Sequence, residues 1–208
     1  MKVEHISFPS DEITLTGDLH LPEEPQRLGA VVLHPHPLYG GERNNNVTVG
    51  LAEALAKAGF PALRFDFRGA GESGGSHGGG EPEVDDVAAA MDTLRARVPE
   101  LKQIAIAAYS FGTYVASLGA KTLQPSAMAC VAPPVAMLDC DGLHGYVGPM
   151  LIVGGDRDQF GPAAAVTELA EMTGAELHLV PGGDHFLLGL EGKIADRVVD
   201  FLDRLTGR

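Results

Sequence analysis

Apolar and polar residues alternate near the start of the chain, a pattern typical of half-buried β-strands. Residues 3–8 (VEHISF) and 12–21 (EITLTGDLHL) carry this pattern on either side of Pro9-Ser10-Asp11, a turn-forming sequence. Two such runs joined by a short turn predict an antiparallel β-hairpin.

After the hairpin, short apolar runs alternate with longer segments whose apolar residues recur every three to four positions. The runs predict strands at residues 29–35, 61–67, 103–110, 127–133, 149–155 and 175–182, and the periodic segments predict helices at 47–59, 84–98, 113–123, 163–174 and 193–205. This alternation favours right-handed crossovers and a mostly parallel sheet. We therefore expect one α/β domain over residues 1–208, with about eight strands.

Composition and charge narrow the classes of function. The 208 residues are 45 % hydrophobic and 21 % charged, as in ordinary globular proteins, and the net charge of −13 disfavours binding to nucleic acid or to anionic membranes. The first residues lack the apolar core of a signal peptide, and no apolar run approaches the roughly 20 residues that span a bilayer. We expect a cytoplasmic protein, monomeric or homodimeric, without membrane insertion.

The cysteines and histidines give no sign of a metal site. Cys130 and Cys140 are too few for a disulfide framework and lack ligand-like spacing, which indicates reduced thiols. His34 and His36 alternate with prolines, and no cluster of Cys, His or carboxylate residues offers a clear set of three or four ligands. We expect neither a metal nor another cofactor.

Two motifs compete to contain a nucleophilic serine. Residues 71–75, GESGG, match G-x-S-x-G in full around Ser73, whereas residues 108–112, AYSFG, depart from it at their first position around Ser110. The motif requires a strand before the serine and a helix after it, because this turn exposes Oγ and directs the next backbone N–H toward a developing oxyanion. Only Ser110 has both neighbours, so we predict Ser110 as the nucleophile and Ser73 as a turn residue.

The same glycine-rich loop suggests a second function. Residues 69–74, GAGESG, fit the G-x-G-x-x-G fingerprint of dinucleotide-binding proteins and follow a predicted strand. The fingerprint also requires a helix at its third glycine, and here more glycines and Pro82 intervene. A nucleotide-binding protein is therefore the weaker alternative.

A serine nucleophile needs a base, and the base needs an orienting acid. The predicted strand 149–155 runs into Asp156-Arg157-Asp158, and the strand at 175–182 is followed by His185. Loops at the carboxyl ends of parallel strands gather at one edge of the sheet, so these groups can meet Ser110. His185 is the predicted base, and Asp156 and Asp158 are both candidates for the acid.

Together these stretches make the chain resemble an α/β-hydrolase, specifically the small lidless predicted serine hydrolases with an HPHP motif. Their motifs are HPHP followed by a Gly pair, then D-x-R-G-x-G-x-S, then an elbow xxSFG, and they stand here at residues 34–41, 66–73 and 108–112. The resemblance covers essentially the whole chain. It implies a mostly parallel sheet of about eight strands with an antiparallel N-terminal hairpin, helices on both faces and no lid domain.

The resemblance also bears on the site residues. It favours Asp158 over Asp156, since Gly155, Asp158 and Pro162 fit the family pattern at this loop. Asp66 and Arg68 are residue types that could be catalytic, but we expect them to brace the site loops through hydrogen bonds.

Two backbone N–H groups would bind the oxyanion in such an enzyme. One is expected from Phe111, which follows the nucleophile, and the other from the loop at residues 34–41. Proline has no N–H, so the candidates in this loop begin with His36 and Leu38, and alignment with the H-G-x turn of the family favours His36.

The expected function is that of a serine carboxylesterase with the triad Ser110, His185 and Asp158, acting on a small-molecule acyl substrate through an acyl-enzyme. The connector at residues 133–148 is short where many relatives insert a lid, so we expect an open site for small or exposed acyl groups. A thioesterase or peptidase with the same triad and a catalytically silent binding protein of the same fold remain alternatives.

Overall fold

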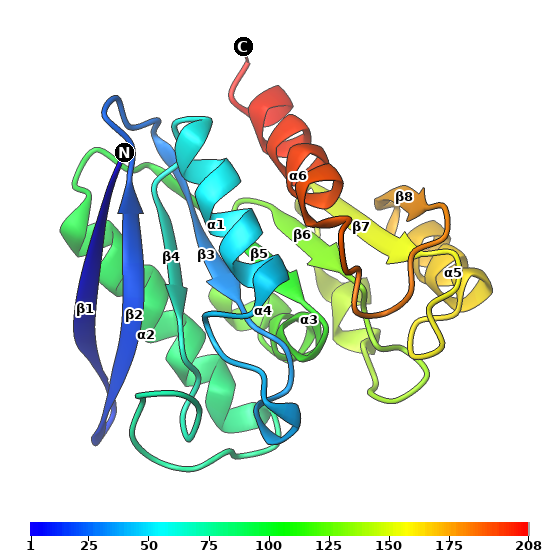
Figure 1. Cartoon of the computed structure of the whole chain (residues 1–208), viewed down its shortest axis with the longest axis horizontal. Coiled ribbons are helices and arrows are strands. Elements are labelled where there is room, and N and C mark those ends of the chain that lie inside the picture. The colour runs from blue at the N-terminus through cyan, green and yellow to red at the C-terminus, as the bar shows by residue number, and fades with distance from the viewer. Residues whose placement is uncertain (208) are drawn as a thin grey trace.

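The computed structural model describes residues 1–207 and contains one eight-stranded sheet covered by helices (Figure 1). The strand order is β1-β2-β4-β3-β5-β6-β7-β8. The first two strands form the predicted hairpin, β2 pairs with β4 antiparallel, and every later pair is parallel. The bounds are β1 (Lys2–Ser10), β2 (Ile13–Leu21), β3 (Leu28–Leu33), β4 (Ala62–Phe65), β5 (Gln103–Tyr109), β6 (Met128–Val131), β7 (Met150–Gly155) and β8 (Glu176–Val180).

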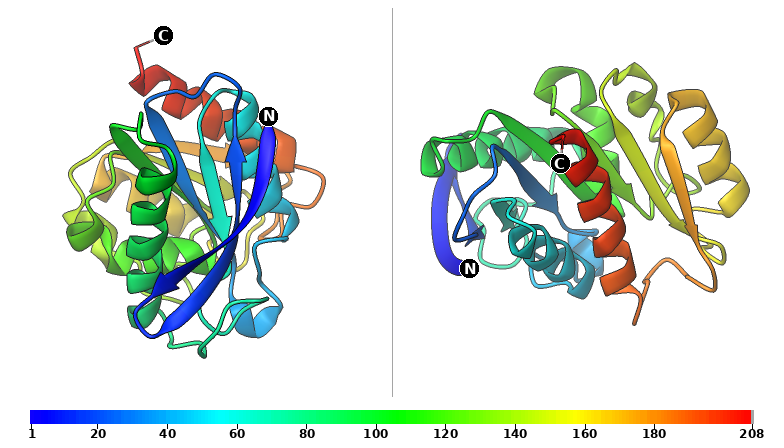
Figure 2. Two further views of the ribbon diagram at one scale, coloured as in Figure 1. Left: turned by 90° about the vertical axis from the view of Figure 1, so that its left-hand side faces the viewer. Right: turned by 90° about the horizontal axis from the view of Figure 1, so that it is seen from above.

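Helices cover both faces of the sheet, as the views in Figure 2 show. One face packs against α1 (Asn46–Lys57) and α6 (Glu191–Leu205), and the other against α2 (Glu81–Arg97), α3 (Phe111–Leu118), α4 (Ala120–Leu123) and α5 (Ala163–Thr173). In β5, Ala105 and Ala107 face α1 and α6, whereas Ile104 and Ile106 face α2 and α3. Because successive side chains of a strand point to opposite faces, a continuous apolar run fills both cores.

The predicted strands and their alternation with helices are confirmed, with strand ends that differ by one or two residues, and the larger differences lie in two helices. The helix predicted at 113–123 begins at Phe111 and is interrupted at Gly119, where α3 passes into α4. Helix α2 begins at Glu81, three residues before the predicted start at 84. Pro82 suits the first helical turn, and the Glu83 side chain accepts the N–H of Gly80 at 2.7 Å, so this earlier start is stabilised locally.

The connectors at the carboxyl ends of the strands are short. A 3₁₀ turn, η1 (Pro37–Tyr39), follows β3, and the link between β6 and β7 holds only η2 (Asp141–Gly145), so residues 1–207 contain no lid domain. None of the helices in this range combines the length and apolar character needed to cross a membrane.

Candidate active site

Ser110 occupies a sharp turn between a strand and a helix. Strand β5 ends at Tyr109 and helix α3 begins at Phe111, so one residue makes the whole turn. Its backbone angles, φ +53° and ψ −116°, are unfavourable for a residue with a Cβ, typically by about 1–3 kcal/mol. The Ser110 N–H donates to the carbonyl of Val131 at 2.9 Å, and its carbonyl accepts from Thr113 at 2.8 Å. These bonds hold the strained serine at the edge of the sheet.

The residues around Ser110 explain which motif positions must be small. A Cβ on Gly112 would lie 2.6 Å from Cβ of Leu33 and 2.9 Å from its carbonyl oxygen, so β3 excludes any side chain there. Ala108 is fully buried in the cluster beneath α2 and α3, where its methyl group is accommodated. The departure from G-x-S-x-G at this position therefore leaves the elbow intact.

Three predicted residues form one hydrogen-bonded chain at the carboxyl edge of the sheet. Ser110 Oγ lies 2.8 Å from Nε2 of His185, and Nδ1 of His185 lies 2.8 Å from Oδ2 of Asp158. All three residues are buried, and they follow β5, β8 and β7 respectively. An ionised carboxylate only accepts, so Nδ1 carries a proton and Nε2 is free to accept one from the serine hydroxyl.

Asp158 rather than Asp156 lies at the histidine. Oδ1 of Asp158 accepts the N–H groups of Phe160 at 2.7 Å and Gly161 at 2.9 Å, while Oδ2 faces the imidazole. Burial alone would raise the pKa of Asp158, but the hydrogen bonds from His185, Gly161 and Phe160 outweigh it and lower the pKa. Asp156 is exposed and accepts the N–H of Gly182 at 2.7 Å.

The backbone of His185 is held by Tyr109, a contact that the sequence analysis missed. The buried Tyr109 hydroxyl donates to the His185 carbonyl at 2.9 Å, and the His185 ring packs edge-on against Phe160 with centroids 4.8 Å apart. Asp184 is exposed, and its side chain accepts the backbone N–H of Phe186 at 3.0 Å within the turn. A polar tyrosine ending the apolar run of β5 was the available sign of this role.

The two residues predicted to supply oxyanion donors lie against each other. The rings of His36 and Phe111 have centroids 4.7 Å apart. The Leu38 N–H donates to Nδ1 of His36 at 3.2 Å, so this amide is engaged within the turn. Burial and the neighbouring His77 lower the pKa of the His36 imidazole.

His34 ties the same loop to the end of β4. It is fully buried, its Nδ1 donates to the carbonyl of Pro35 at 2.6 Å, and its Nε2 accepts the N–H of Phe67 at 3.0 Å. Burial lowers the pKa of His34 to about 4, so the ring is neutral at neutral pH. Because both ring nitrogens bond to backbone groups, His34 has a structural role.

Asp66 and Arg68 brace the loops, as expected from the sequence. The Asp66 carboxylate accepts the backbone N–H of Arg43 at 2.8 Å and that of Glu72 at 3.1 Å, and it also pairs with the Arg43 guanidinium. The Arg68 guanidinium binds the carboxylate of Asp86 at 2.7 Å. The Asp66 contacts join the loop after β3 to the glycine-rich loop after β4, and the Arg68 contact joins the glycine-rich loop to α2.

The glycine-rich loop uses its polar groups internally. Ser73 Oγ donates to the Asp66 carbonyl at 2.7 Å and accepts the N–H of Thr16 at 2.9 Å, so its hydroxyl pins the loop to β2. Glu83 occupies the N–H groups of Gly78 and Gly80 at the start of α2. A phosphate would need such amides free, which counts against the nucleotide-binding alternative.

Residues 1–207 contain no group of three or more His, Cys, Asp or Glu side chains arranged to hold a metal ion.

The chain is similar to known proteins over most of its length. An uncharacterized protein of Rickettsia prowazekii (strain Madrid E) is 30 % identical over 95 % of this chain and 87 % of its own length. A lidless α/β serine hydrolase of Xanthomonas campestris superposes with a TM-score of 0.89 and 28 % identity, covering 99 % of this chain and 95 % of that one. An α/β serine hydrolase homologue of Coxiella burnetii gives 0.88 and 29 %, covering 97 % and 98 %.

A more distant structure, an esterase of Pyrococcus furiosus, shares the fold with a TM-score of 0.84 at 20 % identity, covering 98 % of this chain and 92 % of that one. Residues 30–194 match the family described as alpha/beta hydrolase domain. The chain therefore belongs to the α/β hydrolase family.

Proposed function

We propose that this α/β hydrolase is a serine carboxylesterase that cleaves small or exposed acyl esters through an acyl-enzyme. The observation that carries the proposal is the chain of two 2.8 Å contacts from Ser110 Oγ through His185 to Asp158. A nucleophile, a base and an orienting acid in this order are what acyl transfer requires.

The proposed reaction begins when Ser110 Oγ attacks the carbonyl carbon of the ester and its proton passes to Nε2 of His185. Asp158, bonded to Nδ1, stabilises the imidazolium. The imidazolium then donates this proton to the departing alkoxide as the carbon–oxygen bond breaks, leaving an acyl ester on Ser110. Water, deprotonated by the same histidine, attacks the acyl carbon, and the proton returns to Ser110 Oγ as the acid is released.

The backbone N–H groups of Phe111 and His36 are the proposed donors to the oxyanion. Contact between their side chains keeps the two loops together, and loss of one such donor typically costs about 2.7–4 kcal/mol of transition-state stabilisation.

The expected substrate follows from the openness of the site. The connector between β6 and β7 adds no lid, and large apolar side chains stand exposed on the two flanking loops, Leu38 and Tyr39 on one and Phe186 and Leu188 on the other. This supports short acyl groups or groups presented from outside.

A monomeric or homodimeric state stays a prediction. A cytoplasmic location also stays a prediction, which the two buried free cysteines Cys130 and Cys140 favour.

A fluorophosphonate probe tests the proposal, because it reacts covalently with activated serines. We expect labelling of the unmodified protein and of Ser73→Ala but none of Ser110→Ala. Label that persists in Ser110→Ala and vanishes in Ser73→Ala would refute the assignment. Hydrolysis of p-nitrophenyl esters of increasing chain length then tests the substrate class, and a clear preference for long chains would contradict it.

A further inference from the structure

A second histidine–carboxylate pair lies beside the loop that follows β3, and the proposed mechanism makes no use of it. His77 belongs to the loop between β4 and α2, and its Nδ1 lies 3.1 Å from Oε1 of Glu83. Glu83 is fully buried, and its two oxygens accept the N–H groups of Gly78 and Gly80, each at 2.7 Å. The carboxylate is therefore a fixed negative group behind the imidazole.

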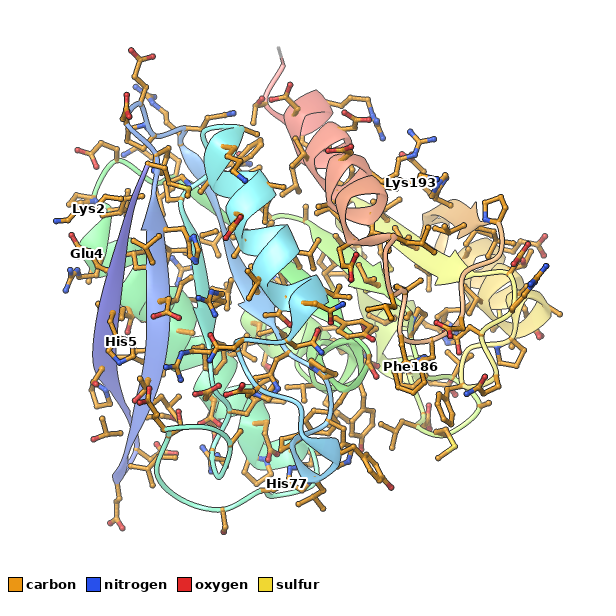
Figure 3. The ribbon with its side chains drawn as sticks, in the orientation of Figure 1. Lys2, Glu4, His5, His77, Phe186 and Lys193 are labelled. Carbon is orange, nitrogen blue, oxygen red and sulfur yellow. The ribbon has the colours of Figure 1, made fainter. Side chains whose placement is uncertain are left out.

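His77 packs against both residues that are proposed to bind the oxyanion. Its ring centroid lies 4.8 Å from that of His36 and 5.3 Å from that of Phe111. Figure 3 shows His77 beside the η1 turn, at the lower edge of the ribbon, whereas Phe186 lies on the loop after β8. His77 thus lies beside the rings of both residues whose backbone N–H groups are the proposed oxyanion donors.

The hydrogen bonds fix the proton on His36. A backbone N–H can only donate, so Nδ1 of His36, which accepts from Leu38 at 3.2 Å, carries no proton. The lowered pKa of this ring keeps it neutral at neutral pH, and the single ring proton is then on Nε2. His36 offers a donor.

The surroundings of His77 favour a ring proton on Nδ1, whereas that of His36 is on Nε2. Its Nδ1 is sealed from solvent and lies 3.1 Å from Oε1 of Glu83, although the direction between the two atoms is not that of a well-aligned hydrogen bond. An ionised carboxylate accepts only, so the proton of a neutral His77 is favoured on Nδ1. The lone pair of Nε2 is left as an acceptor, and 12 % of the side chain remains exposed.

We propose that His36 and His77 together bind a hydroxyl group of the substrate, next to the reacting carbonyl. A hydroxyl group donates and accepts at once, so it can satisfy the Nε2–H of His36 and the Nε2 lone pair of His77. An alkyl group in the same place would cover both nitrogens and leave them without partners. The substrate class is then esters of small hydroxy acids or of polyols, which rests on the proposed esterase function.

Two matched pairs of esters test this subsite. Methyl 3-hydroxybutyrate against methyl butyrate places the hydroxyl on the acyl part, and 2-hydroxyethyl butyrate against ethyl butyrate places it on the alcohol part. With acid release followed by titration at constant pH, we expect kcat/KM of the unmodified protein to favour the hydroxylated ester of one pair by roughly 2- to 12-fold.

The variant His77→Phe, which keeps an aromatic ring in the cluster, is expected to bring this ratio to about one. His77→Ala provides a second variant without a ring nitrogen, and thermal unfolding establishes that each variant is folded. His144→Phe changes an exposed histidine of η2 outside the site and should leave the ratio as it is.

A ratio of about one in both pairs for the unmodified protein overturns the hydroxyl subsite, and so does a preference that survives in both His77 variants. If the esters without the hydroxyl group are hydrolysed in either case, the esterase proposal still stands. Labelling at Ser110 without hydrolysis of any of the four esters rejects the hydroxy-ester class, and absence of both rejects the proposed function and the subsite with it.

Discussion

The hydroxyl of Tyr109 donates a hydrogen bond of 2.9 Å to the backbone carbonyl of His185. Tyr109 directly precedes the nucleophile candidate in the chain, so one buried side chain joins the end of β5 to the loop of the histidine. This bond fixes the distance between the two groups that would exchange a proton in the proposed reaction.

Replacing Tyr109 by Phe should therefore lower kcat more than it raises KM. The ring still fills its place, but the His185 carbonyl loses its donor, and a hydrogen bond of this kind contributes about 0.5–1.5 kcal/mol, or roughly 2- to 12-fold. Steady-state kinetics on a p-nitrophenyl ester measures the effect. Tyr146→Phe, which removes a buried hydroxyl bound to the Pro125 carbonyl, is the matched control and should cost stability without lowering kcat. Equal kcat for Tyr109→Phe and the unmodified protein would exclude a positioning role.

The two aspartates of the loop after β7 are expected to differ sharply. Asp158→Asn removes the charge that orients His185 and stabilises its protonated form, so kcat should fall by a factor on the order of 10³–10⁴. Asp156→Asn alters an exposed carboxylate that caps the N–H of Gly182, and activity should stay within a few-fold. Rates of ester hydrolysis for the two variants, each with its circular dichroism spectrum, distinguish the positions. Similar losses in both would mean that the loop tolerates neither change.

His34 should make folding stability depend on pH. Its folded-state pKa of about 4 lies below the ordinary value of 6.5, so between these values the unfolded chain binds more protons and stability falls as pH is lowered. The stabilisation from neutral His34 is fully present above pH 6.5. Acidification to pH 4 lowers the free energy of unfolding by about 3 kcal/mol through this residue. Asp66, whose charge favours protonation of this ring, and His36, which opposes it, modulate the size of the effect.

Urea unfolding at pH 7 and pH 5 measures this dependence. His34→Gln should be less stable at pH 7 but lose less stability on acidification than the unmodified protein does. Other buried histidines such as His20 contribute to both proteins equally, so the difference isolates His34. His144→Gln, on the surface, should follow the unmodified protein. Parallel curves for His34→Gln and the unmodified protein would show that His34 does not titrate in this way.

Local patterns in the sequence predicted the architecture, and they supplied the candidate residues of the site. Apolar runs identified the strands and helical periodicity identified the helices, because burial on one or both faces determines which neighbouring residues are apolar. Ser110 was distinguished from Ser73 by its strand and helix. The order Ser, Asp, His predicted that His185 and either Asp156 or Asp158 lie at one edge of the sheet, and the family resemblance favoured Asp158. Gly119 shows the limit of this approach, because an interruption within a helical pattern depends on packing.

Contacts between loops that are distant in sequence were not predictable in the same way. The bond from Tyr109 to the His185 carbonyl, the pair of His77 and Glu83, and the bracing of the loops by Arg43 each depend on side-chain direction in the folded chain. Periodicity says nothing of such pairings. Asp156 and Asp158 illustrate this at short range, because two residues along a turn separate a surface carboxylate from one that faces the histidine.

Gly112 provides a direct test of the elbow geometry. A methyl group there would meet Leu33 at 2.6 Å from its Cβ and 2.9 Å from its carbonyl oxygen, and backbone cannot move aside as a flexible side chain can. Gly112→Ala should therefore push α3 away from β3, at a cost of about 1–3 kcal/mol in the free energy of unfolding. Because α3 begins at Phe111, the same displacement would move the proposed oxyanion donor and lower kcat.

Gly154→Ala is the matched control, since a Cβ on this buried strand glycine has no neighbour nearer than 3.4 Å. We expect it to retain kcat and to change stability by less than Gly112→Ala does. Chemical unfolding and ester hydrolysis measured on both variants separate packing from catalysis. If Gly112→Ala kept full stability and full activity, the close approach of α3 to β3 would have no part in holding the serine in its strained conformation.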